Sequence, residues 1–482
     1  MKTTLLTAAA LTLALNPAFA QVETTPPPPA APRPVQIPKP VEKTLANGLR
    51  VIVIEKKGVP LVNARLLIRT GGEGDPSNLA GLADTTASLL SKGTTTRSAE
   101  QIARGVEALG ATLDTGAAWD DSSADLDVMS SKLPAAMAFM ADVVRHPAFR
   151  QEEIDRLRQQ NSDALSVAMK QPARLAGFVL AQVLFGAGPY GHNLGGTPES
   201  LARIKRDDIV AFHRDHYRPD NAILVIGGDI APAKAFAAAQ ELFGGWKAAA
   251  GSHLVPVAWL KQALPSRAVV VDMPAAGQAV VAIGRPGLSR VDPAYHLSLV
   301  TNSILGGGYS SRLNEEIRIK RGLSYGANSS FDLRRDAGPF TASAQTKNES
   351  AGEVAGLIVD ELNKLGTTPV SDDELGPRKA VLIGGFGRQL ETNGGIVGRI
   401  GTLALYGLSL DEINRYVSGV QSVSASDIQK FAAAHLGGND ASIVIVGDAK
   451  KFLPKLQERF KNVEVIPIDE LDVNSATLRK AK

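Results

Sequence analysis

The sequence of 482 residues contains no cysteine, few aromatic residues (5%) and no excess of either charge. Without cysteine the chain has neither disulfides nor thiolate metal sites. Its 52 Lys and Arg against 49 Asp and Glu leave a net charge of +3, which is too balanced for a nucleic-acid-binding surface. A hydrophobic content of 44% in a chain of this length is enough to bury more than one core.

Several familiar catalytic motifs are also missing. The sequence has no Gly-x-Ser-x-Gly elbow and no cysteine nucleophile, and the run Gly306, Gly307 and Gly308 lacks the Lys-Ser/Thr pair of a phosphate-binding loop. His213 and His216 are three residues apart, but no glutamate of a metallopeptidase pattern accompanies them, so we interpret both as structural. None of these chemistries is therefore predicted.

The first forty residues have the composition of an export leader followed by a linker. Lys2, an apolar run over 5–15 and the small residues at 18 and 20 predict a signal peptide cleaved after Ala20. The apolar run is too short for a stable membrane span, and an exported chain without cysteine fits the bacterial periplasm. Prolines concentrate between residues 21 and 40, which predicts an extended linker. We expect a periplasmic protein without membrane insertion.

An internal repeat organises the rest of the chain. The pattern Asp-Ile-x-x-Phe-x-x-x-His starts at Asp208 and again at Asp427, and in both copies an apolar run ending at Gly-Asp follows. The offset is 219 residues (427 − 208). This predicts an α+β fold of two similar halves, each a mixed sheet with helices packed on one face. We expect domains at 41–246 and 266–465, joined by a linker at 247–265 and followed by a tail at 466–482.

Local patterns predict the elements of the first half. Alternating and β-branched residues predict strands over 49–55 and 62–69. Together with the Asn47-Gly48 turn signal, these strands predict a hairpin-like start of the first half. Apolar spacing of three and four residues predicts helices over 79–91, 99–109, 133–145 and 151–170, and the segment 111–129 is expected to form two strands.

The stretch 305–325, LGGGYSSRLNEEIRIKRGLSY, carries the candidate site. A serine at 310 or 311 is suited to cap a helix over 314–321, which Gly322 would end before a strand opens at Tyr325. Arg318 and Tyr325 are thereby expected to face one cavity. The three glycines fit either a tight turn or a hinge or substrate-contacting loop, and the second interpretation is favoured by the resemblance below.

Five phrases in order along the chain resemble the pitrilysin/insulinase superfamily of zinc peptidases. They are GLADTTASLLSKGT (81–94), YGHNLGGTPESLARI (190–204), FHRDHYRPDNAILVIGGD (212–229), the stretch 305–325 and LALYGLSLDEI (403–413). The branch that it most resembles is that of two-domain chains related to mitochondrial processing peptidase. The resemblance implies two α+β halves that close like a clam shell around a peptide.

The zinc motif of the active members is absent. Those members carry His-x-x-Glu-His on a helix, and the matching positions here run from Asp84 to Ser88 without a histidine or a glutamate. The resemblance places the third ligand, a glutamate on a later helix, at or near Ala164. We therefore predict no zinc and no other cofactor in this chain.

The resemblance gives Arg318 and Tyr325 a role. They match the family pattern Arg-x-x-x-Gly-Leu-x-Tyr, whose arginine and tyrosine reach from the second half to the zinc site. A guanidinium can hold a substrate carbonyl or carboxylate, and a phenol can donate to the oxyanion. The leading hypothesis is the non-metal subunit of a heterodimeric periplasmic zinc peptidase, with a zinc-bearing homologous partner and a peptide substrate. The alternative is a structural, peptide-binding or chaperone-like protein of the same fold.

Overall fold

The computed structural model describes residues 37–254 and 256–480. The predicted leader and most of the predicted proline-rich linker lie outside these residues. The described residues belong to one compact unit. Among them, no helix combines the length and the apolar character needed to cross a membrane.

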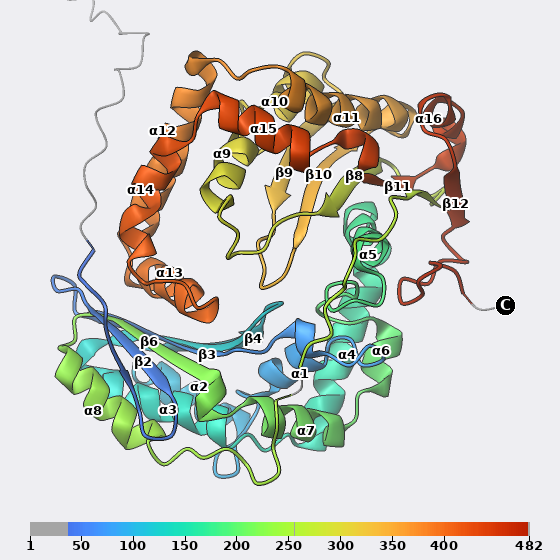
Figure 1. The fold of residues 1–482 in the computed structure, drawn as a ribbon. Coiled ribbons are helices and arrows are strands. Elements are labelled where there is room, and N and C mark those ends of the chain that lie inside the picture. Colours follow the sequence, from blue (N-terminus) through green and yellow to red (C-terminus); the bar gives the residue numbers. More distant parts are fainter. Residues whose placement is uncertain (1–36, 255, 481–482) are drawn as a thin grey trace, which may run out of the picture. The chain divides into compact units, whose positions relative to one another are not determined.

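The described strands form two six-stranded mixed sheets in which five strands follow the same order, while the sixth, at one edge, differs (Figure 1). The first sheet has the order β1-β2-β6-β3-β5-β4 and the second the order β12-β7-β11-β8-β10-β9. The strands of the first are β1 (Val41–Thr44), β2 (Arg50–Glu55), β3 (Leu61–Ile68), β4 (Thr112–Ala117), β5 (Ser122–Met129) and β6 (Ala222–Gly228). Those of the second are β7 (Ala268–Asp272), β8 (Ala279–Pro286), β9 (Ser324–Phe331), β10 (Pro339–Thr346), β11 (Ser442–Gly447) and β12 (Val463–Pro467). The order shared by β2-β6-β3-β5-β4 and β7-β11-β8-β10-β9 confirms the α+β repeat.

The strands at the start of the chain pair differently from the prediction. β2 and β3 form where the sequence predicts them, but they do not form a hairpin, because β6 lies between them. β2 pairs with β6 in parallel and β3 pairs with β6 antiparallel. The Asn47-Gly48 turn instead connects β1 to β2, which are antiparallel neighbours. β6 occupies the position between β2 and β3 because its long apolar run can be buried on both faces of the sheet.

The helices follow the repeat as well. α7 (Arg206–His216) and α15 (Ala425–His435) are related by the predicted offset, since 425 − 206 and 435 − 216 both equal 219. The other helices of the first half are α1 (Leu82–Leu89), α2 (Ala99–Glu107), α3 (Leu133–Arg145), α4 (Gln151–Ala168), α5 (Pro172–Phe185), α6 (Pro198–Arg203) and α8 (Pro232–Phe243). The second half adds α9 (Tyr295–Leu305), α10 (Arg312–Asn314), α11 (Ala351–Thr367), α12 (Asp372–Gln389), α13 (Asn393–Leu405), α14 (Glu412–Ser422) and α16 (Leu453–Arg459). Short helical turns are η1 (Gly72–Gly74), η2 (Ser130–Lys132), η3 (Pro219–Asn221), η4 (Glu315–Ile319), η5 (Asn348–Ser350), η6 (Gly438–Asp440) and η7 (Ala449–Lys451).

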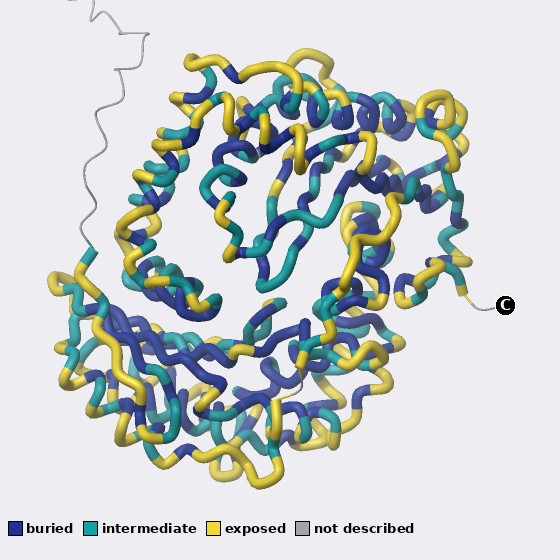
Figure 2. The backbone as a smooth tube through the Cα atoms, in the orientation of Figure 1, coloured by how far each residue is buried: buried dark blue, intermediate teal, exposed yellow. Residues whose placement is uncertain are grey.

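One helix of each half packs on the sheet of the other half. α13 of the second half packs on β3 and β6 of the first sheet, and α5 of the first half packs on β8 and β11 of the second (Figure 1). Successive side chains of β2 point to opposite faces of the sheet and so enter different cores. Val51 and Val53 belong to the core of the first half, whereas Ile52 and Ile54 belong to the core that contains α13. The central strands are buried on both faces as a result, and Figure 2 shows them dark blue.

The exchanged helices contribute much of the burial between the halves. Ile396, Val397, Ile400 and Leu403 of α13 are all buried. Burial of a side chain of this size stabilises a fold by on the order of 2 kcal/mol. The two halves are therefore held to one another by an apolar interface, in addition to the polar contacts described below.

Candidate functional site

The candidate site is built on an unusual helical turn. α10 begins at Arg312, two residues before the predicted start, and runs directly into η4, a π-helical turn in which the Lys320 amide donates to the carbonyl of Glu315 at 2.9 Å. Such turns are rare and often occur at functional sites. Gly322 has φ +62° and ends the helix as predicted.

Arg318 and Tyr325 lie on neighbouring elements that pack together, η4 and β9. The ring of Tyr325 is 89% exposed. The guanidinium of Arg318 lies over the ring of Tyr309, 4.7 Å from its centroid, and forms no ion pair within the described residues. Both groups are thus available to a molecule outside this chain, and Tyr309, itself 66% exposed, holds the guanidinium in place.

The three glycines before the helix differ in what they do. A β-carbon at Gly306 would collide with the backbone nitrogen and hydroxyl of Ser329 on β9, and one at Gly307 would come within 2.9 Å of the Cα of Ser303. Gly308 has more room, since the nearest atom to a β-carbon placed there would be Nη1 of Arg378 at 3.7 Å. Close packing therefore explains Gly306 and Gly307, and a role in substrate contact stays a prediction.

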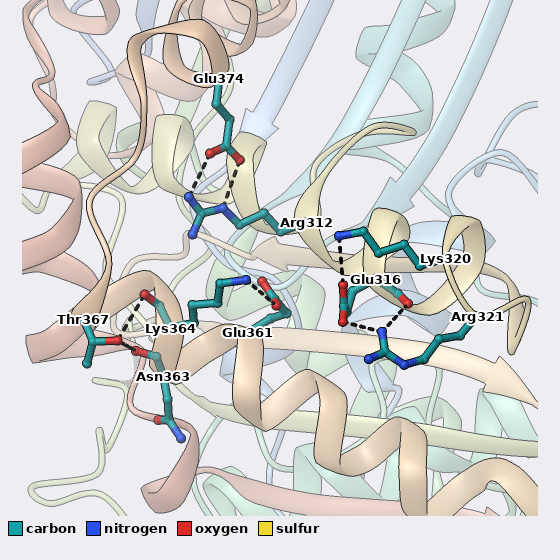
Figure 3. A network of polar contacts seen from close by, with 9 residues as sticks. All are labelled: Arg312, Glu316, Lys320, Arg321, Glu361, Asn363, Lys364, Thr367 and Glu374. Atoms are coloured by element: carbon teal, nitrogen blue, oxygen red, sulfur yellow. Dashed lines mark hydrogen bonds and ion pairs between the residues drawn. The ribbon is translucent and has the colours of Figure 1, made fainter.

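The loop that carries Tyr309 is anchored to α12 (Figure 3). Arg312 donates twice to the carboxylate of Glu374, at 2.9 and 2.8 Å, and both side chains are largely buried. Arg378, one turn further along α12, donates to the carbonyl of Ser310. Two arginines thus fix the two ends of the short segment 310–312, and a bidentate pair constrains orientation as well as distance.

A buried amide joins this loop to β9. Asn314 is 2% exposed, and its Nδ2 donates to the carbonyl of Tyr309 while its Oδ1 accepts from the amide of Ala327 at 3.2 Å. One side chain therefore sets the spacing between the Tyr309 loop and the strand that carries Tyr325. Figure 3 also shows Glu316 paired with both Lys320 and Arg321. Arg321, unlike Arg318, therefore forms an ion pair with a nearby residue of the same segment.

The residues at the former zinc positions do not fit a zinc ion. Asp84 and Ser88 lie on α1, which packs against α4 with Ala164. Burial, and secondly the nearby Asp75, raise the pKa of Asp84 to about 6. Ala164 supplies only a methyl group, and Asp163 beside it accepts a hydrogen bond from Gln159. A catalytic zinc needs three protein ligands. Within residues 37–254 and 256–480, no three His, Asp or Glu side chains come together as a metal site.

Two profiles of one peptidase family match the chain in sequence order. Residues 50–197 match the profile described as insulinase (peptidase family M16), and residues 203–382 match the one described as the peptidase M16 inactive domain. The chain belongs to the M16 peptidase family. This confirms the resemblance seen in the sequence.

The M16 relatives carry different names. An uncharacterized zinc protease of Streptomyces coelicolor is 27% identical over 84% of this chain and 89% of its own length. A Helicobacter pylori protein named a non-peptidase homologue is 25% identical over 83% of this chain and 92% of its own. A crystal structure from Pseudomonas fluorescens, titled peptidase M16 inactive domain, has a TM-score of 0.79 and 28% identity over 85% of this chain and 98% of that one. The inactive-domain profile, the Pseudomonas structure and the non-peptidase homologue support a non-catalytic M16-like protein.

Sequence reasoning missed the residues that support the candidate pair. Tyr309 lies in the Gly-Ser-rich segment that the sequence analysis selected. An aromatic residue in that segment was the one sequence feature that could have indicated a partner for Arg318. Glu374 and Arg378 lie more than fifty residues further along the chain, so no local pattern links them to the loop.

Proposed function

We propose that this chain is the non-metal subunit of a two-chain zinc peptidase and lends Arg318 and Tyr325 to a zinc site on a homologous partner. The observation that carries the proposal is the contrast between two sites in one chain. The positions for zinc ligands hold Asp84, Ser88 and Ala164. By contrast, the Arg318 guanidinium on η4 is partly exposed, the Tyr325 phenol on β9 is exposed, and neither is paired with a charged side chain in the described part of the chain.

The chemistry assigned to the pair follows from their side chains. The guanidinium presents a planar fork of donors that matches a peptide carbonyl or carboxylate. The phenol can donate a hydrogen bond to the oxyanion that forms when a metal-bound water attacks a peptide bond. The zinc would lie in the partner, and this chain would supply orientation and charge stabilisation.

The leader pattern supports placement of the complex in the periplasm. The N-terminal residues that carry this pattern are outside the described part of the chain, so the proposal rests here on the sequence alone.

The experiment compares the chain alone with the chain co-expressed with an exported homologue that bears His-x-x-Glu-His. We expect the lone chain to cleave no peptide and to bind no stoichiometric zinc, and the purified pair to do both. Co-purification of the two chains in equal amounts would establish the assembly. Robust peptide cleavage by the lone chain would overturn the proposal.

A second candidate function, peptide binding without catalysis, has one observation in its favour. β4 and β9 are edge strands of the two sheets, each paired on one side alone among the described strands. The free backbone groups of an edge strand can pair with an extended peptide. Binding of a peptide by the lone chain, together with failure of any zinc-bearing homologue to co-purify, would favour this candidate.

A further inference from the structure

A cavity of about 540 Å³ lies in the first half, apart from the Arg318 loop. Its walls come from the segment that leads into α1, from α7, from the turn after α5 and from the C-terminal segment at Val473 and Asn474. This volume is in the usual range for small-molecule sites. None of its lining residues belongs to the proposed catalytic pair, so a ligand of this cavity is independent of the proposed function.

The lining is acidic and, among the described residues, contains no lysine or arginine. Four carboxylates contribute to it, from Glu73, Asp75, Asp208 and Asp215. Asp215 is neutralised by Arg214 at 2.7 Å. Asp75 accepts the amides of Gly81 and Ala83, and Asp208 accepts the amide of Lys205 at the start of α7. These amides carry no formal charge. The nearest arginine to Glu73 is Arg335, which lies outside the lining at 3.9 Å, so among the described residues no lysine or arginine within the lining pairs with Asp75 or Asp208.

Burial makes this arrangement costly. Burial, and secondly the carboxylate of Asp120, raise the pKa of Glu73 to about 8, and burial also raises the pKa of Asp75. An environment that disfavours a carboxylate anion is one in which a cationic ligand would relieve the cost. An anionic ligand would increase it. Glu73 is therefore largely protonated near pH 7, with Arg335 3.9 Å from its carboxyl group, and a cationic ligand would favour its deprotonation.

A buried histidine supplies a second, independent observation. His216 lines the cavity, is 5% exposed, and its Nδ1 has no hydrogen-bond partner among the described residues. Burial lowers its pKa to about 4, so the ring is neutral near pH 7 and one of its nitrogens can accept a hydrogen bond. Nε2 of His192, another lining residue, lies 3.4 Å from the carboxylate of Asp75. Unpaired buried polar atoms are uncommon, and a ligand would satisfy them.

A metal ion is a poor match, since no three His, Asp or Glu side chains in the described residues converge as ligands. Leu79, Leu82 and Phe212 give the cavity an apolar wall beside the acidic one. We propose that the cavity binds an organic cation, an ammonium or guanidinium group on a short carbon chain. The source is either a free amine or the side chain of a lysine or arginine in a peptide.

The test is calorimetric titration of the full chain at pH 7.5 and low salt with three probes. These are 1,4-diaminobutane, N-acetyl-lysine methylamide and, as the neutral isostere, N-acetyl-norleucine methylamide. Binding of the diamine alone would identify a free amine, and binding of the lysine derivative would identify a peptide side chain. Binding of the norleucine derivative as tightly as the lysine derivative, or no binding of either cation, would overturn the proposal.

Two variants locate the site. Asp208→Asn keeps an oxygen for the Lys205 amide and removes the charge, and we expect it to weaken binding about tenfold, as the loss of one partly buried charge pair would. Asp207→Asn removes the same charge from the exposed neighbour on α7, outside the lining, and should change affinity less than about twofold. Glu73→Gln replaces a carboxyl group that is largely protonated at pH 7.5, so it should weaken binding less than Asp208→Asn does. Equal weakening by Asp207→Asn and Asp208→Asn would contradict the assignment.

Discussion

The hydroxyl of Tyr406 donates a hydrogen bond of 2.8 Å to the carboxylate of Asp120, 286 residues earlier in the chain. Asp120 is 2% exposed and also accepts from the hydroxyl of Tyr190 at 2.6 Å and from the amide of Arg335 at 2.7 Å. Two of these three donors come from the second half. A single buried carboxylate in the first half thus binds donors from both halves, and neither half alone could form this set of hydrogen bonds.

Replacing this carboxylate should destabilise the whole unit. Asp120→Ala leaves three donors without an acceptor in a buried place, which we expect to cost about 3 kcal/mol of unfolding free energy. Urea denaturation measures it. Asp114→Ala on the neighbouring strand β4 is the matched control, because Asp114 is exposed. Equal losses in the two variants would show that the contacts of Asp120 carry no special weight.

Removing the Arg318 guanidinium should slow the proposed two-chain peptidase without dissociating it. We expect Arg318→Ala to lower kcat/KM of the complex by roughly 10- to 100-fold, the range for one charge-assisted hydrogen bond. Steady-state kinetics on a peptide substrate gives the value. Arg321→Ala removes the same charge three residues away, where Glu316 already binds it, and should have little effect. If Arg318→Ala and Arg321→Ala had the same kcat/KM, Arg318 would have no specific role in catalysis.

The phenol of Tyr325 is tested by removing one oxygen. Tyr325→Phe should lower kcat by about a hundredfold with KM nearly unchanged, as expected for a donor that acts only in the transition state. The control is Tyr309→Phe, which keeps the ring beneath Arg318 and loses only a hydroxyl. An unchanged kcat in Tyr325→Phe would remove this residue from the mechanism.

Glu374 is predicted to act as a positioning residue through Arg312. Glu374→Ala frees the Arg312 side chain that fixes the loop next to Tyr309, so we expect kcat of the complex to fall about tenfold while KM and assembly change little. Asp373→Ala is the control, since Asp373 is exposed in the same first turn of α12. Partial rescue by Glu374→Gln, which keeps one acceptor, would separate positioning from general loss of stability.

The buried carboxyl of Glu73 should make stability depend on pH. Burial and then Asp120 raise its pKa to about 8, against the opposing effects of Arg335 and the Gly71 amide, whereas the unfolded value is 4.5. Between these values the folded chain retains a proton that the unfolded chain has lost, so this group lowers stability as pH rises from 4.5 to 8. Glu73→Gln lacks the penalty. Its unfolding free energy relative to the parent should rise by up to about 1.4 kcal/mol per pH unit across that window. Parallel pH profiles of the two proteins would show that Glu73 does not carry the shift.

The sequence predicted elements that depend on local pattern. The boundaries of α3, the strands β4 and β5 and the equivalence of α7 with α15 are confirmed, because apolar spacing and a repeated motif are visible without knowledge of contacts. The predicted tail boundary at 466 differs from the end of β12 at Pro467, which pairs with β7 in the second sheet.

What the sequence did not predict depends on contacts between distant segments. The hairpin expected from β2 and β3 was wrong because β6, more than 150 residues later, inserts between them. The Arg312–Glu374 pair and the Asp120 contacts join residues from 62 to 286 positions apart. The family resemblance predicted Arg318 and Tyr325, but not the anchored Tyr309 loop that packs against Arg318.

The exchange of α5 and α13 determines when the first half can finish folding during synthesis. One face of β6 is covered by α13, which starts 165 residues after β6 ends (393 − 228). Until that helix has been made, the face exposes an apolar strand surface of the kind that aggregates. We therefore expect a fragment cut between residues 247 and 265 to be insoluble, because its β6 face would stay uncovered.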